Sequence, residues 1–267
     1  MKKLIFALAL VASLAYARTP VQIVESGYLK FGVFPSQAPI SYVGEDGNFD
    51  GYDVLLAHRI AKDLGVKARF TPLNVRTMID ALRKDKVDIL LTNVVITEDR
   101  AHIVDFLRPY RRNASGLIAR KGVKIGSFED LNGKNIALVK GSNTAKFFED
   151  FLPGEVNLLE FDDHEDAVNA LKNGAADAYA TSWLGLYRCV RENPEFVYTD
   201  LVFGEVNRVA PAIKKGELEL ARWLNAEMAK LGKEGFFRKL YDETLKDVLG
   251  GAFDVDEVII DEKNYKF

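Results

Sequence analysis

Residues 86–110 decide the fold, and they read KVDILLTNVVITEDRAHIVDFLRPY. The apolar run at 87–91 is typical of a buried strand, because strands covered on both faces are continuously hydrophobic. Thr97 is the natural N-cap of a helix that begins after it, since its hydroxyl can accept from a free backbone N–H group. Arg100 then falls in the first turn of that helix, just beyond the end of the strand.

Arg100 occupies a position that helix electrostatics disfavour. A cation in the first turn opposes the helix dipole by about 0.3–1 kcal/mol. An anion docked against the guanidinium and the neighbouring N–H groups would explain the residue, so the pattern predicts a carboxylate-binding site. The alternative is an ordinary salt bridge to an Asp or Glu of the same chain, as most surface arginines make.

The first 17 residues have the pattern of a cleavable signal peptide. Two lysines precede an apolar run over residues 4–12, and residues 15–17 form the small-x-small cleavage site AYA. The apolar run is too short to cross a bilayer core of about 30 Å, so we expect an exported, periplasmic chain. No cysteine near the cleavage site offers a lipid anchor, and Cys189 alone can form no internal disulfide.

Composition and charge argue against several classes of function. The chain carries 36 Lys and Arg against 39 Asp and Glu, a formal net charge of −3, and cleavage would remove two more positive charges. A mildly acidic chain without a basic run is a poor partner for nucleic acid or anionic membranes. With 48% hydrophobic residues among 267, the chain is long enough for one or two domains with a substantial core.

Strand and helix patterns alternate along most of the chain. We expect strands at 28–34, 66–70 and from 87 onward, with helices at 51–64 and 77–84. This order predicts a parallel sheet covered by helices, whose ligands bind at the carboxyl ends of the strands. Asp53, near the start of the first helix, is most simply an N-terminal cap, with a role in a ligand site as the alternative.

A second cycle of strands and helices follows, so two α/β lobes are predicted. Its strands are expected at 135–139, near 157–160 and at 176–180, and its helices at 145–151 and 164–173. The last third differs, with a strand at 205–213 and helices at 217–231 and 233–249 that should return to the first lobe. A strand-like stretch at 257–260 would cover a sheet edge.

The turn Gly141-Ser142-Asn143-Thr144 joins a strand to a helix in the second cycle. Its backbone N–H groups and hydroxyls can receive a carboxylate, and simple helix capping is the alternative. Because Arg100 lies at the matching junction of the first lobe, both features are predicted to face one cleft.

Motifs for turnover, cofactors or metals are absent from the sequence. It has no G-x-S-x-G, H-E-x-x-H or P-loop pattern, and no G-x-G-x-x-G after a strand. His58, His102 and His164 fall on separate predicted helices without metal-ligand spacing and are interpreted as surface or packing residues. Cys189 is interpreted as a core residue, so we expect a binding protein with no cofactor and no metal.

An ordered set of motifs resembles one known family. The motifs are Pro39-Ile40-Ser41-Tyr42, Gly51-Tyr52-Asp53-Val54, Lys86-Val87-Asp88-Ile89, Thr97-Glu98-Asp99-Arg100 with Val104-Asp105-Phe106 and Pro109-Tyr110, Asp130-Leu131-Asn132-Gly133-Lys134, and Lys233-Glu234-Gly235-Phe236 with Lys239-Leu240-Tyr241. From about residue 26 to 248 the chain resembles the polar amino-acid branch (family 3) of the periplasmic solute-binding proteins that feed ABC importers.

The resemblance implies an α/β fold of the second periplasmic-binding-protein type, with two parallel-core sheets joined by hinge strands near 112–118 and 204–210. We expect a signal peptide at 1–17, a first lobe of 18–111 plus 208–267, and a second lobe of 112–207. Such a protein is a monomer that closes over a small carboxylate-bearing solute, an amino acid or close relative, and presents it to an inner-membrane permease.

The resemblance also assigns roles to residues of the site. It implies that Arg100 grips the α-carboxylate with help from Ser142, Asn143 and Thr144, and that Asn93 offers its backbone carbonyl to the ammonium group. A charge-assisted bidentate contact of this kind contributes roughly 1.5–3 kcal/mol.

Two positions beside these residues depart from the family pattern. Val95 replaces the Thr or Ser that usually donates to the carboxylate, and Val75 or Gln37 replaces the aromatic residue that covers the ligand.

The third departure concerns the ammonium group. Ser182 stands five residues after Asp177, where the family has an aspartate that pairs with the ammonium. Burying an ammonium without an anion costs several kcal/mol. Either another acid such as Glu205 or Asp177 substitutes, or the ligand is not an ordinary α-amino acid.

The family resemblance leaves two alternatives to a transport receptor. One is a cyclohexadienyl dehydratase-like lyase on the same fold, against which the missing acid at Ser182 argues, since a lyase needs a general acid. The other is a sensor or adhesin module, which nothing in the sequence requires.

Overall fold

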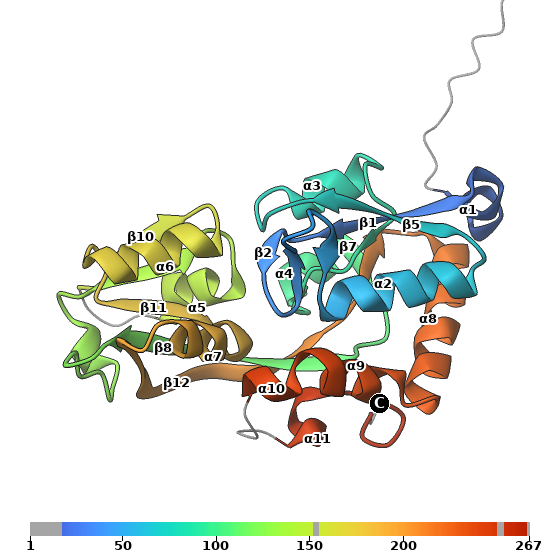
Figure 1. Cartoon of the computed structure of the whole chain (residues 1–267). Helices are drawn as coiled ribbons and strands as arrows, with labels where there is room; N and C mark the ends of the chain where they lie inside the picture. Colours follow the sequence, from blue (N-terminus) through green and yellow to red (C-terminus); the bar gives the residue numbers. More distant parts are fainter. Residues whose placement is uncertain (1–17, 152–154, 250–253, 266–267) are drawn as a thin grey trace, which may run out of the picture.

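The computed structural model describes residues 18–151, 155–249 and 254–265. The predicted signal peptide lies outside these ranges. Within them, two α/β lobes lie side by side, and two long strands run between them (Figure 1). None of the helices in the described ranges combines the length and apolar character needed to cross a membrane.

The first lobe is built on a five-stranded sheet with the order β5-β1-β6-β13-β7. Its strands are β1 (Tyr28–Val33), β5 (Lys67–Pro72), β6 (Ile89–Leu90), β7 (Val104–Phe106) and β13 (Ala212–Lys214). β1 pairs in parallel with β5 and β6, as the alternation predicted. β13 runs antiparallel to β6 and β7, so the sheet is mixed at this edge.

The helices of this lobe are α1 (Pro20–Ser26), α2 (Tyr52–Asp63), α3 (Met78–Arg83), α4 (Glu98–Ala101), α8 (Leu218–Lys233) and α9 (Phe236–Thr244). The apolar face of α2, including Leu56 and Ile60, is fully buried. Gly51 is the N-cap of α2 with φ 113°, and a Cβ there would lie 2.7 Å from two backbone oxygens. The prediction that Asp53 caps this helix is therefore wrong, because the Asp53 side chain is buried inside the lobe.

The second lobe has a sheet with the order β10-β9-β11-β8-β12. Its strands are β8 (Arg111–Arg120), β9 (Asn135–Val139), β10 (Asn157–Phe161), β11 (Ala178–Ser182) and β12 (Phe196–Val209), and its helices are η1 (Glu129–Leu131), α5 (Asn143–Phe151), α6 (His164–Asn173) and α7 (Trp183–Glu192). β9 is parallel to β10 and β11. Both lobes thus have the parallel core that the fold class predicted.

The two long strands that join the lobes are β8 and β12. They pair antiparallel from Arg111 opposite Val209 to Arg120 opposite Phe196. The strand predicted at 205–213 is divided between β12 and β13, with Pro211 in the gap, where a residue without an N–H group cannot continue the ladder. The predicted lobe boundaries fall close to the first-lobe ends of these two strands and stay a prediction.

Several short elements differ from the sequence prediction. A three-stranded antiparallel sheet of β2 (Ser36–Gln37), β3 (Ser41–Val43) and β4 (Phe49–Asp50) was not predicted, nor was α1. The helix predicted at 233–249 is divided into α9 and α10 (Lys246–Leu249). The return of this region to the first lobe is confirmed, since Tyr52 of α2 donates to the Phe237 carbonyl of α9 at 3.1 Å.

The C-terminal segment packs on the first lobe near the start of β8. The stretch predicted as strand-like is instead the end of α11 (Val255–Val258) followed by an isolated bridge between Ile259 and Arg111. The backbone N–H of Ile260 donates to the Tyr110 carbonyl at 2.9 Å. A capping box at Asp254 favours the helix, because it satisfies N–H groups that a strand would leave free.

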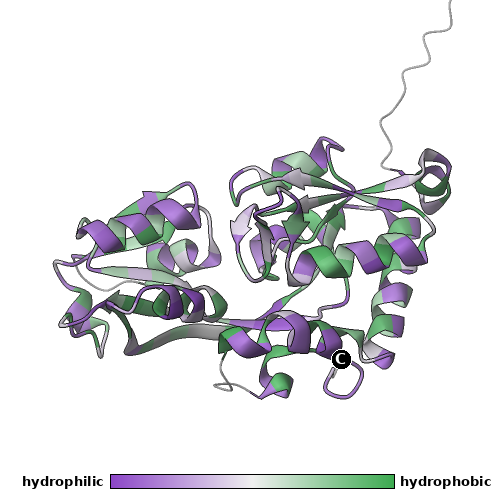
Figure 2. Cartoon of the chain, in the orientation of Figure 1, coloured by the Kyte–Doolittle hydropathy of each residue, from purple (hydrophilic) through white to green (hydrophobic). Residues whose placement is uncertain are grey.

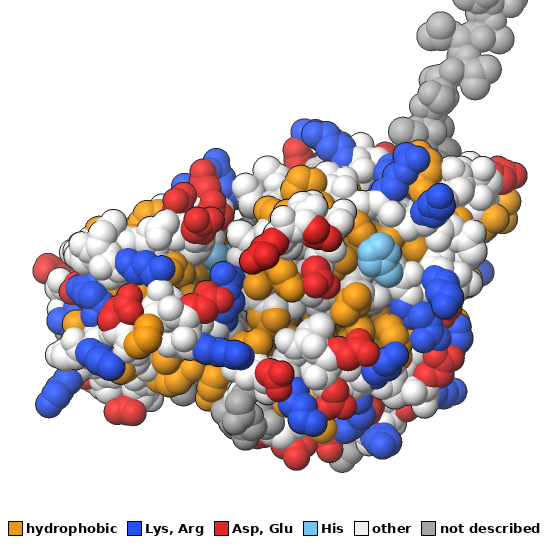
Figure 3. All heavy atoms as spheres, viewed as in Figure 1, with side chains coloured by type: hydrophobic (Ala, Val, Ile, Leu, Met, Phe, Trp, Pro, Cys, Tyr) orange, Lys and Arg blue, Asp and Glu red, His pale blue; other side chains and the backbone are white. Residues whose placement is uncertain are grey.

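Hydrophobic residues gather on the central strands and inward helix faces of both lobes (Figure 2). Buried apolar clusters lie under each sheet, so each lobe has its own core. On the visible face of the molecule, acidic and basic side chains are interspersed (Figure 3). The cores hold each lobe rigid, which places the functional question at the junction between them.

Candidate binding site between the lobes

Arg100 lies on the single helical turn α4. The Thr97 hydroxyl accepts from the Arg100 N–H at 3.3 Å, so the predicted N-cap is confirmed. Four residues generate little macrodipole, however, so helix electrostatics alone do not explain the arginine. The surroundings of the guanidinium decide whether it needs an anion.

The Arg100 guanidinium bridges the two lobes. Nη1 donates to the Val95 carbonyl of the first lobe at 3.1 Å, and Nη2 donates to the Gly141 carbonyl of the second at 3.3 Å. Burial lowers the pKa of Arg100 to about 10, and no carboxylate in the described ranges offsets this effect. The salt-bridge alternative therefore fails among the residues that the structure describes. A cation removed from water without a counter-ion favours an anionic ligand.

A cavity of about 40 Å³ lies between the lobes beside Arg100. Eight of the nine predicted ligand-binding residues line it: Gln37, Val75, Asn93, Arg100, Ser142, Asn143, Thr144 and Ser182. The ninth, Val95, is buried, and its carbonyl accepts from Arg100. Both halves of the predicted site thus face one cleft, and the binding roles assigned to these residues stay predictions.

The second-lobe side of the cavity is formed by the turn before α5. Ser142 Oγ accepts from the Ala145 N–H at 3.1 Å and lies 2.7 Å from Thr144 Oγ1. Ser142 therefore caps the helix and lines the cavity at once. Because the first N–H groups of a helix lack internal partners, this turn can receive a carboxylate that Arg100 holds.

Sequence reasoning missed seven further residues that line the cavity: Phe34, Met78, Thr92, Val94, Asn113, His164 and Thr181. His164 does pack, with its ring against that of Tyr179, and it also lines the cavity. It is the first residue of α6, and no local pattern reveals that this helix end faces the other lobe. Asn113 lies on β8, where the sequence shows only an exposed-looking polar run.

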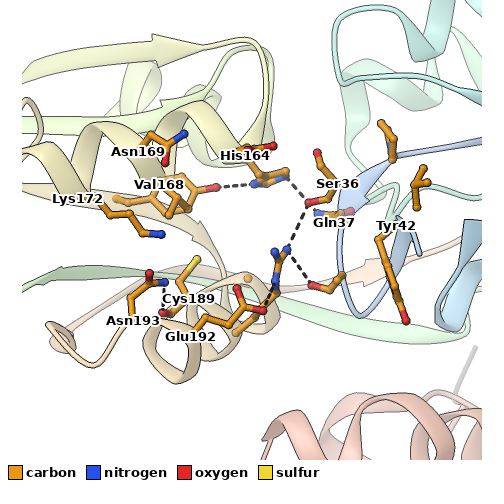
Figure 4. A pocket seen from close by; sticks show the side chains of 17 residues that line it. Ser36, Gln37, Tyr42, His164, Val168, Asn169, Lys172, Cys189, Glu192 and Asn193 are labelled. Atoms are coloured by element: carbon orange, nitrogen blue, oxygen red, sulfur yellow. Dashed lines mark hydrogen bonds and ion pairs between the residues drawn. The ribbon is translucent and has the colours of Figure 1, made fainter. Parts of the chain in front are cut away.

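His164 connects the lobes by hydrogen bonds (Figure 4). Its Nε2 lies 3.3 Å from Nε2 of Gln37 in the first lobe, and its Nδ1 contacts the Tyr179 hydroxyl in the second. Burial, and then the charge of Arg188, lowers the pKa of His164 to about 4. The ring is therefore neutral at neutral pH, so Nε2 accepts from Gln37 and Nδ1 donates to Tyr179.

A second, larger cavity of about 390 Å³ lies on the other side of Gln37 and His164, which line both cavities. Arg188 of α7 lines it and donates to the carbonyls of Ser36 at 3.4 Å and Ala38 at 3.5 Å. Gln37 and His164 thus lie between the small cavity at Arg100 and this wider space.

A buried ion pair holds the loop that carries Asn93. Asp53 Oδ1 lies 3.6 Å from Arg111 Nη2, and both side chains are 0% exposed. Asp53 also accepts from the Tyr110 hydroxyl at 2.7 Å and from the Asn93 N–H at 2.9 Å. Arg111 donates to Asn93 Oδ1 at 3.0 Å. These bonds hold the backbone of Asn93 at φ 57°, a conformation that residues other than glycine rarely adopt.

Asp177, one of the two acids named as a replacement for the missing aspartate, does not line the cavity. Asp177 precedes β11, at the end opposite Ser182, and accepts from the Asn135 N–H at 2.9 Å. The side chain of Glu205 lies outside the described residues. The described lining of the cavity contains neither Asp nor Glu.

The structure has two α/β lobes joined by two strands, and a cation of one lobe faces a helix N-terminus of the other across a cleft. These features define a two-lobe solute-binding protein. Residues 29–247 match the family model of the bacterial extracellular solute-binding proteins, family 3. The chain belongs to this family.

Individual relatives share this architecture. An ABC transporter glutamine-binding protein of Bacillus subtilis is 33% identical over 75% of this chain and 74% of its own length. A solute receptor for L-cysteine from Neisseria gonorrhoeae is 33% identical, with a TM-score of 0.88 over 91% of this chain and 100% of that structure. A cysteine-binding protein from Campylobacter jejuni is 36% identical, with a TM-score of 0.87 over 91% of this chain and 98% of that one. These relatives favour the receptor prediction over the dehydratase alternative.

Proposed function

We propose that this protein is the periplasmic receptor of an ABC importer and that it binds a small α-amino acid, with cysteine the best-supported ligand. The observation that carries the proposal is the Arg100 guanidinium, which is half-buried in the cleft between the lobes and has no carboxylate partner among the described residues. The ligand's carboxylate would supply the missing charge, and the turn before α5 would complete its hydrogen bonds.

The size of the cavity supports a small ligand. A volume of about 40 Å³ is room for about three water molecules. Cysteine has seven non-hydrogen atoms, so even a small amino acid requires some opening of the lobes, and a long side chain would also require the contact between Gln37 and His164 to separate. Two similar structures, each 33% or more identical to this chain, are a solute receptor for L-cysteine and a cysteine-binding protein.

We infer the partners and location from the same proposal. The closed form would dock as a monomer on an inner-membrane permease, after export by the signal peptide at residues 1–17. No turnover is expected, because the proposed role is to bind the amino acid and release it unchanged. Incubation with prephenate or arogenate tests this directly, since growing product absorbance would show a lyase.

Isothermal titration calorimetry with a panel of amino acids tests the proposed ligand. The mature protein is first unfolded and refolded to remove any co-purified solute, and is then titrated with cysteine, cystine, glutamine and arginine. We expect binding of one small amino acid, tightest for cysteine under reducing conditions. Binding of none of the four, or of arginine alone, would contradict the proposal.

Ligand affinity is expected to fall as the pH drops below about 6.5. In the closed form burial holds the pKa of His164 at about 4, below its ordinary value of 6.5, and opening the lobes returns the ring to water. The closed form is therefore fully favoured above the ordinary pKa, and its advantage is lost as pH falls from 6.5 to 4. The loss should reach about tenfold in Kd for each pH unit in that window.

Titrations of wild type and two histidine variants between pH 4.5 and 8 isolate this effect. His164→Gln should flatten the pH profile, because its amide has no charge to gain. His102→Gln is the matched control, since that histidine is exposed, and it should keep the wild-type slope. A profile for His164→Gln as steep as that of wild type would rule out His164 as the titrating group.

A further inference from the structure

Two buried side-chain oxygens at the cleft have no hydrogen-bond partner. They are Asn113 Oδ1 and Gln37 Oε1, on residues that are 2% and 9% exposed. Both residues line the cavity beside Arg100. Folded proteins pair the large majority of such buried polar atoms, so two unpaired acceptors at one cavity indicate a donor that a ligand brings.

Two of the neighbouring donor groups are already engaged elsewhere. Arg100 donates to the Val95 and Gly141 carbonyls, and the amide nitrogen of Gln37 faces His164. The two oxygens also come from different parts of the fold, because Gln37 lies on β2 of the first lobe and Asn113 lies on the joining strand β8. A donor group would therefore bind where the closed lobes bring these elements together.

The number and the charge of these acceptors indicate which chemical group of a ligand would donate to them. Asn113 Oδ1, Gln37 Oε1 and the backbone carbonyl of Asn93 are three neutral acceptors, and a primary ammonium group has three N–H donors. The described lining holds no carboxylate. An ammonium group here would be bound by hydrogen-bond geometry, without a counter-ion.

On the basis of the proposed function, we propose that Asn113 and Gln37 accept hydrogen bonds from the α-ammonium group of the amino acid. Their amide oxygens take the place of a carboxylate at this site. Specificity for the α-amino group then depends on oriented amide oxygens, and a ligand that lacks this group leaves both oxygens unpaired.

Calorimetry with L-cysteine and with 3-sulfanylpropanoic acid, which lacks only the α-amino group, tests the proposal. Wild type should bind cysteine at least about tenfold more tightly than the analogue. Asn113→Leu should weaken cysteine binding by about tenfold and change binding of the analogue by less than about twofold. Asn113→Asp should bind cysteine at least as tightly as wild type, because it keeps an acceptor and adds charge.

Glu205→Gln is the matched control for an acidic partner, and it should leave cysteine binding unchanged. The proposal is overturned if Asn113→Leu keeps wild-type affinity, if Asn113→Asp binds as weakly as Asn113→Leu, or if only Glu205→Gln loses cysteine. Gln37→Leu and the comparison of the two ligands on wild type decide the question if Asn113→Leu does not fold. Failure of wild type to bind any amino acid would instead contradict the proposed function, so the two failures are distinguishable.

Discussion

Replacing Arg100 with alanine is expected to weaken ligand binding strongly without unfolding the protein. In the proposed site the guanidinium supplies the charge for the ligand's carboxylate, and its loss should weaken binding by about tenfold to 150-fold. The ligand-free protein should melt at or above the wild-type temperature, because burial already disfavours the charge of Arg100 and no described carboxylate depends on it. Calorimetry and thermal melts with and without cysteine measure both quantities.

Two further variants separate charge from geometry at this position. Arg100→Lys keeps the charge but not the planar fork, so it should recover only part of the affinity. Arg83→Ala removes an exposed arginine of the same lobe and should bind like wild type. Unchanged affinity in Arg100→Ala would remove the basis of the proposed function.

Asp53→Ala is expected to destabilise the protein by about 3–5 kcal/mol, because it leaves the Arg111 charge buried without its partner. The Tyr110 hydroxyl and the Asn93 N–H also lose their acceptor. Urea unfolding of the ligand-free protein measures the loss, with the slope compared between variants to confirm that the same surface unfolds.

The double variant Asp53→Ala with Arg111→Met tests the cause of this loss. Removing both charges should destabilise less than Asp53→Ala alone, since no unpaired charge remains. Asp80→Ala breaks an exposed pair with Lys84 on α3 and should cost far less than Asp53→Ala. A loss below about 1 kcal/mol in Asp53→Ala would show that the pair does not hold the first lobe.

The alternation of strands and helices could be predicted from sequence because apolar periodicity is local. β9 was predicted with its observed bounds, and α6 likewise. The small sheet β2-β3-β4 could not be predicted, since its two- and three-residue strands carry too few side chains to show a period. The proline at position 211 indicates a break in the strand predicted at 205–213, but the prediction did not take it into account.

The candidate site divides in the same way. Arg100 and the turn at 142–144 follow the carboxyl ends of predicted strands, so topology alone brought them to one cleft. His164 and Asn113 could not be found, because their role depends on how the lobes close and on the path of the joining strand. Asp53 was misread because a carboxylate near a helix start is usually a cap, whereas here glycine at 51 turns the chain and sends the acid inward.

The C-terminal segment is hydrogen-bonded to the first-lobe end of the joining strand β8. Ile259 bridges Arg111, Ile260 bonds the Tyr110 carbonyl, and Arg112 donates to the carbonyls of Asp256 and Ile259 at 2.7 and 2.9 Å. In the proposed closure of the lobes, the first-lobe end of β8 would therefore be braced by residues 254–260, which lie far along the chain from Arg100. In a fluorescent sensor built on this protein, the dyes should be attached away from residues 254–260. The signal would then report closure of the lobes without changing the flexibility of the joining strands.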